Sequence, residues 1–340
     1  MITKFINRMI SNESLTFEES ASIMTQIMNG EVSDVQLSAF LVSLRMKGAT
    51  SDEIAGMATV MREKSNQISL DYELVDTCGT GGDGQNLFNI STACIFVAAG
   101  MGLKIAKHGN RAASGSCGSA DVLEGLGINI ELSPNQVSQC IESVGAGFMF
   151  APMFHPAMKY AGPVRQALGI PTIFNILGPL TNPAKATHQM LGVADIKLGK
   201  QMAESLQKMG VQRALVVHCD SEDGGVDELT LNGINHMWSL QNNKITKTEF
   251  TALDIQMEPI SLNAIRGKDK IYNASIIKSV LDGDNSPHRE IILLNCGVIA
   301  QMCNLVDTLS EGIDLAKATI DSGKAKNKLV ELTELSLSFQ

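Results

Sequence analysis

The chain has few aromatic side chains and no paired cysteine motif. Aromatic residues make up 4% of its 340 residues, and its 7 cysteines include no CxxC pair. An odd number of cysteines without such a pair argues against a disulfide framework or a zinc site, and it fits a reducing compartment. We therefore expect a cytoplasmic protein.

Membrane and nucleic-acid partners are not expected either. No stretch approaches the roughly 20 apolar residues of a membrane-spanning helix. At the N-terminus, Ile2, Phe5, Ile6 and Met9 follow helical spacing, which predicts an amphipathic helix rather than a signal peptide. The formal net charge of −9 argues against non-specific binding of nucleic acid.

Residues 1–70 carry only helical signals. Apolar residues repeat at helical spacing, for example at Leu37, Phe40, Leu41 and Leu44. Three capping boxes predict where helices begin: Thr16 with Glu19, Ser33 with Gln36, and Thr50 with Glu53. We therefore expect a small helical domain over residues 1–70, joined by part of residues 165–190.

Residues 71–340 show a different pattern, in which short apolar runs alternate with helical segments. The runs cover residues 74–75, 103–106, 147–150 and 214–218, and the helical segments cover 92–101, 119–126, 134–143, 156–168 and 197–209. This alternation predicts an α/β domain with a mostly parallel central sheet. Asn232-Gly233 predicts the turn of a hairpin within residues 225–250, and the last 50 residues again look helical.

Acidic residues are absent from two long windows of this acidic chain. Asp and Glu total 36, yet none occurs from Gly84 to Ala120 or from Ser143 to Ala194. The average frequency would put roughly nine acids there. Buried core segments also exclude acids, which explains part of the depletion. The windows nevertheless keep basic side chains, and this local reversal of sign predicts an anionic ligand: Lys104, Lys107, His108, Arg111, Lys159 and Arg165.

A run of acids has the opposite character. Five of them fall within residues 220–228: Asp220, Glu222, Asp223, Asp227 and Glu228. Such a run is more often a solvated loop, and the ligand spacing of an EF-hand is missing. Asp227 and Glu228, directly before the expected hairpin, could also present two carboxylates to a divalent ion.

A glycine-rich turn occupies residues 76–84, between a predicted strand and a predicted helix. Gly79, Gly81 and Gly84 satisfy the GxGxxG spacing, but the acid that a dinucleotide site needs about twenty residues later is absent. A Walker A loop is excluded because the Gly-Lys-Ser/Thr ending is missing. The remaining interpretation is a loop whose backbone N–H groups approach an anion closely.

Two further segments fit an anion site with this turn. Residues 89–92 read Asn-Ile-Ser-Thr at a predicted helix N-terminus, where free N–H groups and the helix dipole favour phosphate. Residues 107–111 follow the next predicted strand. Loops at the carboxyl edge of successive parallel strands converge where α/β sheets bind ligands, so we expect these three segments to meet.

Together these segments resemble the anthranilate phosphoribosyltransferase family. The matching motifs run in the family's order: GTGGD at 79–83, NIST at 89–92, KHGNR at 107–111, GSADVLE at 118–124, HPAMK at 155–159, Pro163–Arg165 with Leu168-Gly169, NILGPL at 175–180 with Asn182-Pro183, and Asp227-Glu228. Single motifs are shared with pyrimidine nucleoside phosphorylases, whereas the full set is much more specific.

The resemblance implies a fold, an activity and partners. It implies a nucleoside phosphorylase/phosphoribosyltransferase-like fold that forms a homodimer through the helical domain. It implies transfer of the 5-phosphoribosyl group from phosphoribosyl pyrophosphate to the amine of anthranilate in tryptophan biosynthesis, with two Mg²⁺ ions per subunit. Ile2, Phe5 and Met9 are candidates for the apolar face of the dimer, or equally for the intrachain core.

The resemblance also implies roles for individual residues. Ser91, Asp227 and Glu228 would hold magnesium; Gly79, Asn110 and Arg165 would bind anthranilate, with Arg165 on its carboxylate. Lys107 would stabilise the leaving pyrophosphate, and no general base is nominated. The donor would be bound by Gly79, Gly82, Asp83, Leu87, Asn89, Ile90, Ser91, Thr92, Lys107, His108, Gly109, Asn110, Arg111, Ala112, Ala113, Ser114, Gly115 and Ser119.

Two positions depart from the family pattern, and two other functions compete with this one. Leu87 stands where Thr is usual, and Pro171 where Arg is usual. A pyrimidine nucleoside phosphorylase is one alternative, but GTGGD, NIST and the Asp-Glu pair argue against it. A non-catalytic relative that binds nucleic acid is the other, and it should show a basic surface and degraded motifs.

Overall fold

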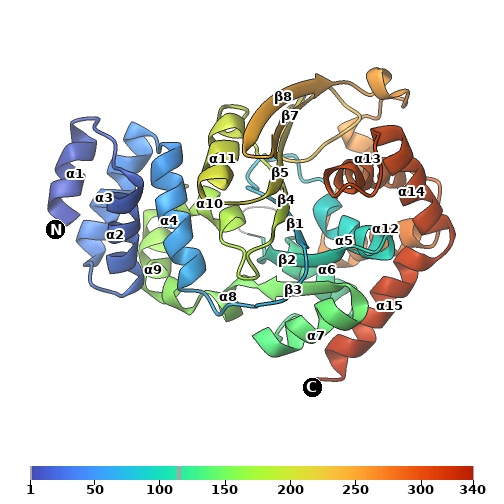
Figure 1. Ribbon diagram of the computed structural model, residues 1–340, viewed down its shortest axis with the longest axis horizontal. Helices are drawn as coiled ribbons and strands as arrows, with labels where there is room; N and C mark the ends of the chain where they lie inside the picture. Colours follow the sequence, from blue (N-terminus) through green and yellow to red (C-terminus); the bar gives the residue numbers. More distant parts are fainter. Residues whose placement is uncertain (1, 113–115, 340) are drawn as a thin grey trace.

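The computed structural model describes residues 2–112 and 116–339, and it begins with a group of four helices. These are α1 (Ile2–Ile10), α2 (Phe17–Met28), α3 (Asp34–Lys47) and α4 (Ser51–Glu63), at one end of the molecule (Figure 1). Each of α2 to α4 starts directly after the predicted cap residue, Thr16, Ser33 or Thr50. All three reciprocal capping boxes are present, so the predicted helix starts are confirmed.

The apolar faces of these helices share one core with later segments. That core also contains side chains from α9 (Gly162–Leu168), α10 (Phe174–Leu177) and α11 (Lys197–Lys208). Ile2, Phe5 and Met9 are buried in it, at 3%, 6% and 2% exposure. These three residues were candidates for either the dimer face or the intrachain core, and the structure places them in the intrachain core.

The rest of the described chain forms an eight-stranded sheet. Its order is β3-β2-β1-β4-β5-β7-β8, with β6 also paired to β5. Strands β1 to β5 are mutually parallel, and β6, β7 and β8 pair antiparallel. The bounds are β1 (Leu74–Gly79), β2 (Lys104–Gly109), β3 (Ala146–Phe150), β4 (His188–Gly192), β5 (Arg213–Ser221), β6 (Gly224–Val226), β7 (Ile234–Gln241) and β8 (Lys244–Phe250). The predicted mostly parallel sheet is confirmed.

Helices cover the sheet on both sides (Figure 1). Helix α11 lies between the sheet and α4, and so joins the helical group to the sheet. Helix α5 (Ile90–Gly100) packs on β1 and β2 at the other side, under a layer of C-terminal helices. The remaining helices are α6 (Ser119–Gly125), α7 (Pro134–Val144), α8 (Ala151–Phe154), α12 (Lys270–Leu281), α13 (Pro287–Met302), α14 (Leu309–Asp321) and α15 (Lys324–Leu337). In the described part of the chain, none of the helices has the length and hydropathy to cross a membrane.

Two local predictions were wrong. The hairpin turn lies at Asn242-Asn243, between β7 and β8, and not at Asn232-Gly233. Both asparagines have positive φ, 50° and 57°, as a type I′ turn requires, whereas Asn232-Gly233 precedes β7. The helix expected over 156–168 is broken into a 3₁₀ segment (Pro156–Tyr160) and α9, because Pro163 has no N–H to continue the first segment and suits the start of the second.

Candidate active site

Three predicted segments meet at the carboxyl edge of the central strands. Strand β1 pairs with β2 on one side and with β4 on the other, and Gly79 at its end lies opposite Gly192 at the end of β4. The glycine-rich turn follows β1, and the N-terminus of α5 follows that turn. Lys107 and His108 lie in the last residues of β2. This is the edge where parallel α/β sheets bind ligands.

Asp227 lies directly against the glycine-rich turn. Its Oδ2 accepts a hydrogen bond of 2.7 Å from the backbone N–H of Gly81. A Cβ atom at Gly79 would lie 2.3 Å from the same oxygen, and one at Gly192 would lie 1.5 Å from the Asp227 carbonyl oxygen. Glycine at both strand ends is therefore required for the carboxylate to reach the turn. Sequence reasoning missed Gly192, because β4 was not recognised as a strand.

Glu228 lies beside the N-terminus of α5. Its Oε1 accepts a 3.1 Å hydrogen bond from the backbone N–H of Ser91. The Ser91 hydroxyl in turn lies 3.3 Å from Nζ of Lys107, which also donates to the Thr77 carbonyl. Lys107 is only 1% exposed. The fold thus brings together Ser91, Lys107 and the Asp227-Glu228 pair, which are far apart in sequence.

Both carboxylates have raised pKa values. Burial, followed by the neighbouring Asp83, raises the pKa of Asp227 to about 7. Burial, followed by Asp227 itself, raises the pKa of Glu228 to about 8. Adjacent, partly buried carboxylates with raised pKa values are a fitting partial ligand set for a divalent cation. Within residues 2–112 and 116–339 no three acidic, histidine or cysteine side chains gather around one point, so a cation would need further ligands from its substrate and water.

A third carboxylate, that of Asp76, is fully buried and lies behind Lys107. Its Oδ1 accepts from the backbone N–H of His108 at 3.2 Å, and its Oδ2 accepts from Nε2 of Gln189 at 3.3 Å. Burial raises the pKa of Asp76, and the charge of Lys107 opposes that rise. Sequence reasoning gave Asp76 no role. Its signal was an acid inside an otherwise apolar strand, directly before the glycine-rich turn.

His108 pairs with His155 beneath the loop after β2. Their Nε2 atoms lie 3.2 Å apart, and both rings are buried, at 8% exposure each. Burial lowers the pKa of His155 to about 4 and lowers the pKa of His108 well below its ordinary value. Both rings are therefore neutral near pH 7, with one donating to the other. The pair joins two of the predicted motifs and shapes the base of the loop.

The segment at the start of α5 is held by structural hydrogen bonds. Asn89 donates to the Cys117 carbonyl at 3.0 Å and accepts from Nδ2 of Asn273 at 2.9 Å. Ile90 is 1% exposed and Thr92 is fully buried, and the Thr92 hydroxyl has no hydrogen-bond partner among the described residues. Of this predicted quartet, the Ser91 side chain is the one directed at the Lys107 and Glu228 cluster.

The turn between β1 and α5 contains three further residues that are predicted to bind the phosphoribosyl donor. Gly82 has a φ of 80°, the left-handed region that favours glycine. Asp83 accepts from the backbone N–H of Gln85 at 3.0 Å, which bends the turn. Leu87 forms an isolated antiparallel bridge with Arg266. The backbone at Leu87 therefore keeps a defined position although the family's hydroxyl is missing.

The loop after β2 is closed by two acidic side chains of α6, Asp121 and Glu124. Arg111 forms ion pairs of 3.2 Å with Asp121 and 2.7 Å with Glu124. Asp121 also accepts from the backbone N–H groups of Ala112 and Gly118, at 3.0 and 2.8 Å. The guanidinium of Arg111 is therefore already neutralised within the chain.

The other predicted residues of this loop differ in accessibility. Asn110 is exposed and its Oδ1 accepts from the Arg111 N–H at 2.8 Å. Gly109 packs closely on Phe148 and Ser119, since a Cβ atom there would lie 3.0 and 3.2 Å from their side chains. Three residues that are predicted to bind the phosphoribosyl donor lie outside the described residues: Ala113, Ser114 and Gly115.

Arg165 lies on α9, on the side of the helical group. It is partly exposed, its guanidinium lies 5.2 Å from the ring centroid of Phe174, and burial lowers its pKa. Within the described chain it forms no ion pair, which leaves its fork free for an anion. Pro171, the second departure from the family pattern, lies after this helix, and its carbonyl accepts a hydrogen bond from Arg45 of α3.

Comparison with known proteins gives a consistent result along the whole chain. Residues 3–65 match the helical bundle domain of a glycosyl transferase family, and residues 71–326 match its a/b domain. The chain is 48% identical to anthranilate phosphoribosyltransferase from Dehalococcoides mccartyi, over 100% of this chain and 99% of that one. It is 48% identical to the enzyme of the same name from Chloroflexus aggregans, over 98% of each.

Solved structures agree with the sequence relatives. The anthranilate phosphoribosyltransferase of Thermus thermophilus superimposes with a TM-score of 0.91 at 39% identity, covering 97% of this chain and 98% of that one. The enzyme of Saccharomyces cerevisiae, solved in complex with PRPP and Mg, superimposes with a TM-score of 0.90 at 27% identity, covering 99% and 98%.

Proposed function

The chain belongs to the anthranilate phosphoribosyltransferase family, and on that premise we propose how its own residues divide the reaction. The enzyme transfers the 5-phosphoribosyl group of phosphoribosyl pyrophosphate to the amine of anthranilate and releases pyrophosphate. The alternatives of a pyrimidine nucleoside phosphorylase and a nucleic-acid-binding relative find no support. The observation that best supports the division of roles below is the meeting of Asp227, Glu228, Ser91 and Lys107 at the edge of the sheet.

Ser91, Asp227 and Glu228 hold magnesium in this proposal, with two ions per subunit. Two partly buried carboxylates with raised pKa values and an adjacent hydroxyl supply hard oxygen ligands. Mg²⁺ usually keeps waters and substrate phosphates among its ligands, so a partial protein set suits it. Once bound, magnesium neutralises charge on the pyrophosphate oxygens.

Lys107 stabilises the leaving pyrophosphate. Breaking the bond at the anomeric carbon develops positive charge on the ribose and negative charge on the leaving group. The ammonium of Lys107 is oriented by Thr77 and Ser91 and lies at the carboxyl edge of the sheet, where the pyrophosphate binds. The phosphates of the donor are held by those backbone N–H groups of the Gly79–Asp83 turn and of the α5 N-terminus that do not already donate to Asp227 or Glu228. The other described residues of the predicted donor-binding set, from Leu87 to Ser119, line or support this region in the proposal.

Anthranilate binds from the other side of the site, next to α9. The free fork of Arg165 pairs with the acceptor carboxylate, and exposed Asn110 contacts its ring substituents, near Gly79. The acceptor nitrogen attacks the anomeric carbon as pyrophosphate leaves, and positioning supplies much of the rate. The aromatic amine loses its proton readily after bond formation, so the mechanism needs no general base.

We also propose the division of the chain, its assembly and its location. Residues 1–70, together with the part of 165–190 that contains α9 and α10, form the helical domain, and 71–340 form the donor-binding domain; the shared core supports this grouping. A homodimer forms through the helical domain in the cytoplasm. Ile2, Phe5 and Met9 are occupied in the core, so the dimer uses outward side chains of α1 and α3: Ile10, Val35 and Met46, at 70%, 80% and 83% exposure.

The function is tested by the fluorescence of anthranilate. Purified protein with phosphoribosyl pyrophosphate, anthranilate and Mg²⁺ is expected to consume that fluorescence, and omission of any one component should stop the loss. Folded protein that consumes no anthranilate would refute the activity. Product formation from a pyrimidine nucleoside and inorganic phosphate would favour a phosphorylase, and strong retention on heparin at moderate salt would favour nucleic-acid binding.

A further inference from the structure

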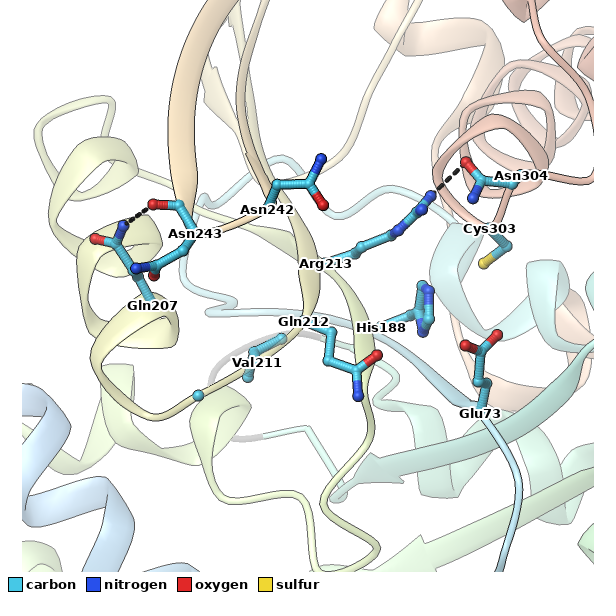
Figure 2. Close-up of a pocket in the computed structure, with 11 residues that line it drawn as sticks. Glu73, His188, Gln207, Val211, Gln212, Arg213, Asn242, Asn243, Cys303 and Asn304 are labelled. Carbon is cyan, nitrogen blue, oxygen red and sulfur yellow. Dashed lines mark hydrogen bonds between the residues drawn. The ribbon is translucent and has the colours of Figure 1, made fainter.

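A cavity of about 470 Å³ opens at the amino edge of the sheet, opposite the candidate active site (Figure 2). His188 begins β4 and Arg213 begins β5, and both line this cavity. Glu73, the residue before β1, lines it as well. Gly192, which packs against Asp227, ends β4 at the other edge. Since a strand rises roughly 3.3 Å per residue, the two ends of β4 lie about 13 Å apart, and the cavity is separate from the catalytic cluster.

The volume of this cavity lies in the range of small-molecule sites. Its wall comes from elements that are distant in sequence: the starts of β4 and β5, the β7–β8 turn, and the C-terminal ends of α11 and α13. Several of these elements are joined to one another by hydrogen bonds. Gln207 of α11 donates to the Asn243 carbonyl of the turn at 2.7 Å, and Arg213 donates to the Met302 carbonyl of α13 at 3.0 Å. The cavity is thus formed by fixed structural elements.

Two opposite charges face this cavity without pairing with each other. Arg213 contacts the Met302 carbonyl and the Asn304 side chain, and its guanidinium has no carboxylate partner among the described residues. The exposed carboxylate of Glu73 has neither a hydrogen bond nor an ion pair in the part of the chain that the structure describes. In Figure 2 the Arg213 guanidinium points toward Asn304 and the Glu73 carboxylate toward Cys303, and no interaction is drawn between Arg213 and Glu73.

The remaining lining is polar. Amide side chains of Gln212, Asn242 and Asn304 surround the charges, and Val211 supplies one of the few apolar contacts. Such a wall offers both hydrogen-bond donors and acceptors, which an apolar ligand would leave unpaired. A simple anion would meet the repulsion of Glu73, and a simple cation would meet that of Arg213. A zwitterion satisfies both charges.

We propose that this cavity binds a free α-amino acid with a polar side chain. The α-carboxylate takes the open edge of the Arg213 guanidinium, which matches a carboxylate in geometry. The α-ammonium pairs with Glu73. The side chain of the ligand exchanges hydrogen bonds with the amides of Gln212 and Asn242, and ordered water fills the remaining volume. This binding function is separate from phosphoribosyl transfer.

The probe for this site is L-asparagine, titrated into the full chain in a calorimeter with and without donor and anthranilate. Saturable binding is expected in both cases, because the site does not overlap the active site. Succinamate lacks the ammonium and 3-aminopropanamide lacks the carboxylate, and each should bind at least about tenfold more weakly. L-Leucine has the same shape as L-asparagine and should also bind more weakly, because its side chain cannot bond to the amides.

Matched variants locate the binding. Glu73→Gln and Arg213→Gln are each expected to weaken L-asparagine binding at least about tenfold, and the exposed control Glu258→Gln should leave it unchanged. Arg213→Lys retains a donor for the Met302 carbonyl and serves if Arg213→Gln does not fold. No saturable heat with wild-type protein, unchanged affinity in Glu73→Gln, or equal binding of succinamate would each overturn the proposal. These outcomes are independent of the anthranilate assay, which is run on the same samples.

Discussion

Gly79 and Asp227 are in direct contact across the site, although they lie in different parts of the chain. A Cβ atom at Gly79 would be 2.3 Å from Oδ2 of Asp227, the same oxygen that accepts from the Gly81 N–H. Such a distance is far inside van der Waals contact. The position of a proposed metal ligand therefore depends on the absence of a side chain at the end of β1.

Gly79→Ala is expected to displace the Asp227 carboxylate and to reduce kcat/KM for the donor by about 100-fold, as small misplacements in active sites do. The magnesium concentration needed for half-maximal rate should rise in parallel. Gly162→Ala is the matched control, since its added methyl group would meet no atom within 4 Å and its φ is not positive. Wild-type kinetics in Gly79→Ala would show that Asp227 does not need this position.

Asp227→Asn and Glu228→Gln keep the size of each side chain and remove its charge. Each is expected to lower the rate at physiological magnesium by at least about 100-fold, because a carboxylate is lost from the proposed metal set. Higher magnesium should restore part of the activity. Binding of magnesium measured by calorimetry in the presence of donor would separate metal loss from misfolding. Unaltered magnesium dependence in both variants would contradict the assignment.

Arg165→Ala is expected to raise the KM for anthranilate by about tenfold to a hundredfold, the effect of losing a charge-assisted hydrogen bond. The KM for the donor should stay within about twofold, since the donor's proposed contacts lie on the sheet. Gln166→Ala changes the exposed neighbour on the same helix and serves as control. A change confined to donor affinity would assign Arg165 to the donor instead.

The His108–His155 pair should make the protein sensitive to acid. Burial lowers the pKa of His155 from 6.5 to about 4, so the unfolded state binds protons in this range while the folded state does not. The contribution of neutral His155 to the free energy of unfolding is fully present above pH 6.5 and is lost as the pH falls toward 4. One pKa unit corresponds to about 1.4 kcal/mol. The difference between the folded and unfolded states therefore lowers the free energy of unfolding by on the order of 3 kcal/mol between pH 6.5 and pH 4.

Urea unfolding of wild type and His155→Gln at pH 7 and pH 4.5 measures this loss. The wild type is expected to lose more stability between the two conditions, because glutamine does not take up a proton. Equal losses in the two proteins would show that the buried histidine pair does not cause the acid sensitivity.

Structural features that depend on residues close together in sequence could be predicted without the structure. The capping boxes were predicted correctly because Thr16 and Glu19 contact each other within one helical turn. The alternation of strands and helices also predicted the parallel sheet. Strand β4 was missed because His188 and Gln189 break its apolar run. Both residues are buried, and the Gln189 amide donates to Asp76 and to the Pro179 carbonyl, partners that only the fold brings close.

By itself the sequence determined the starts of α2, α3 and α4, the α/β class and, through ordered motifs, the family, and it predicted an anion-binding edge of the sheet. Only the tertiary structure decided that Gly192 makes room for Asp227, that Arg111 is neutralised by Glu124, and that the hairpin turns at Asn242-Asn243. It also revealed the cavity between Glu73 and Arg213. The reason is physical. Strand order and register determine which side chains from distant parts of the sequence meet, and the helix, strand and turn preferences of single residues do not encode strand order or register.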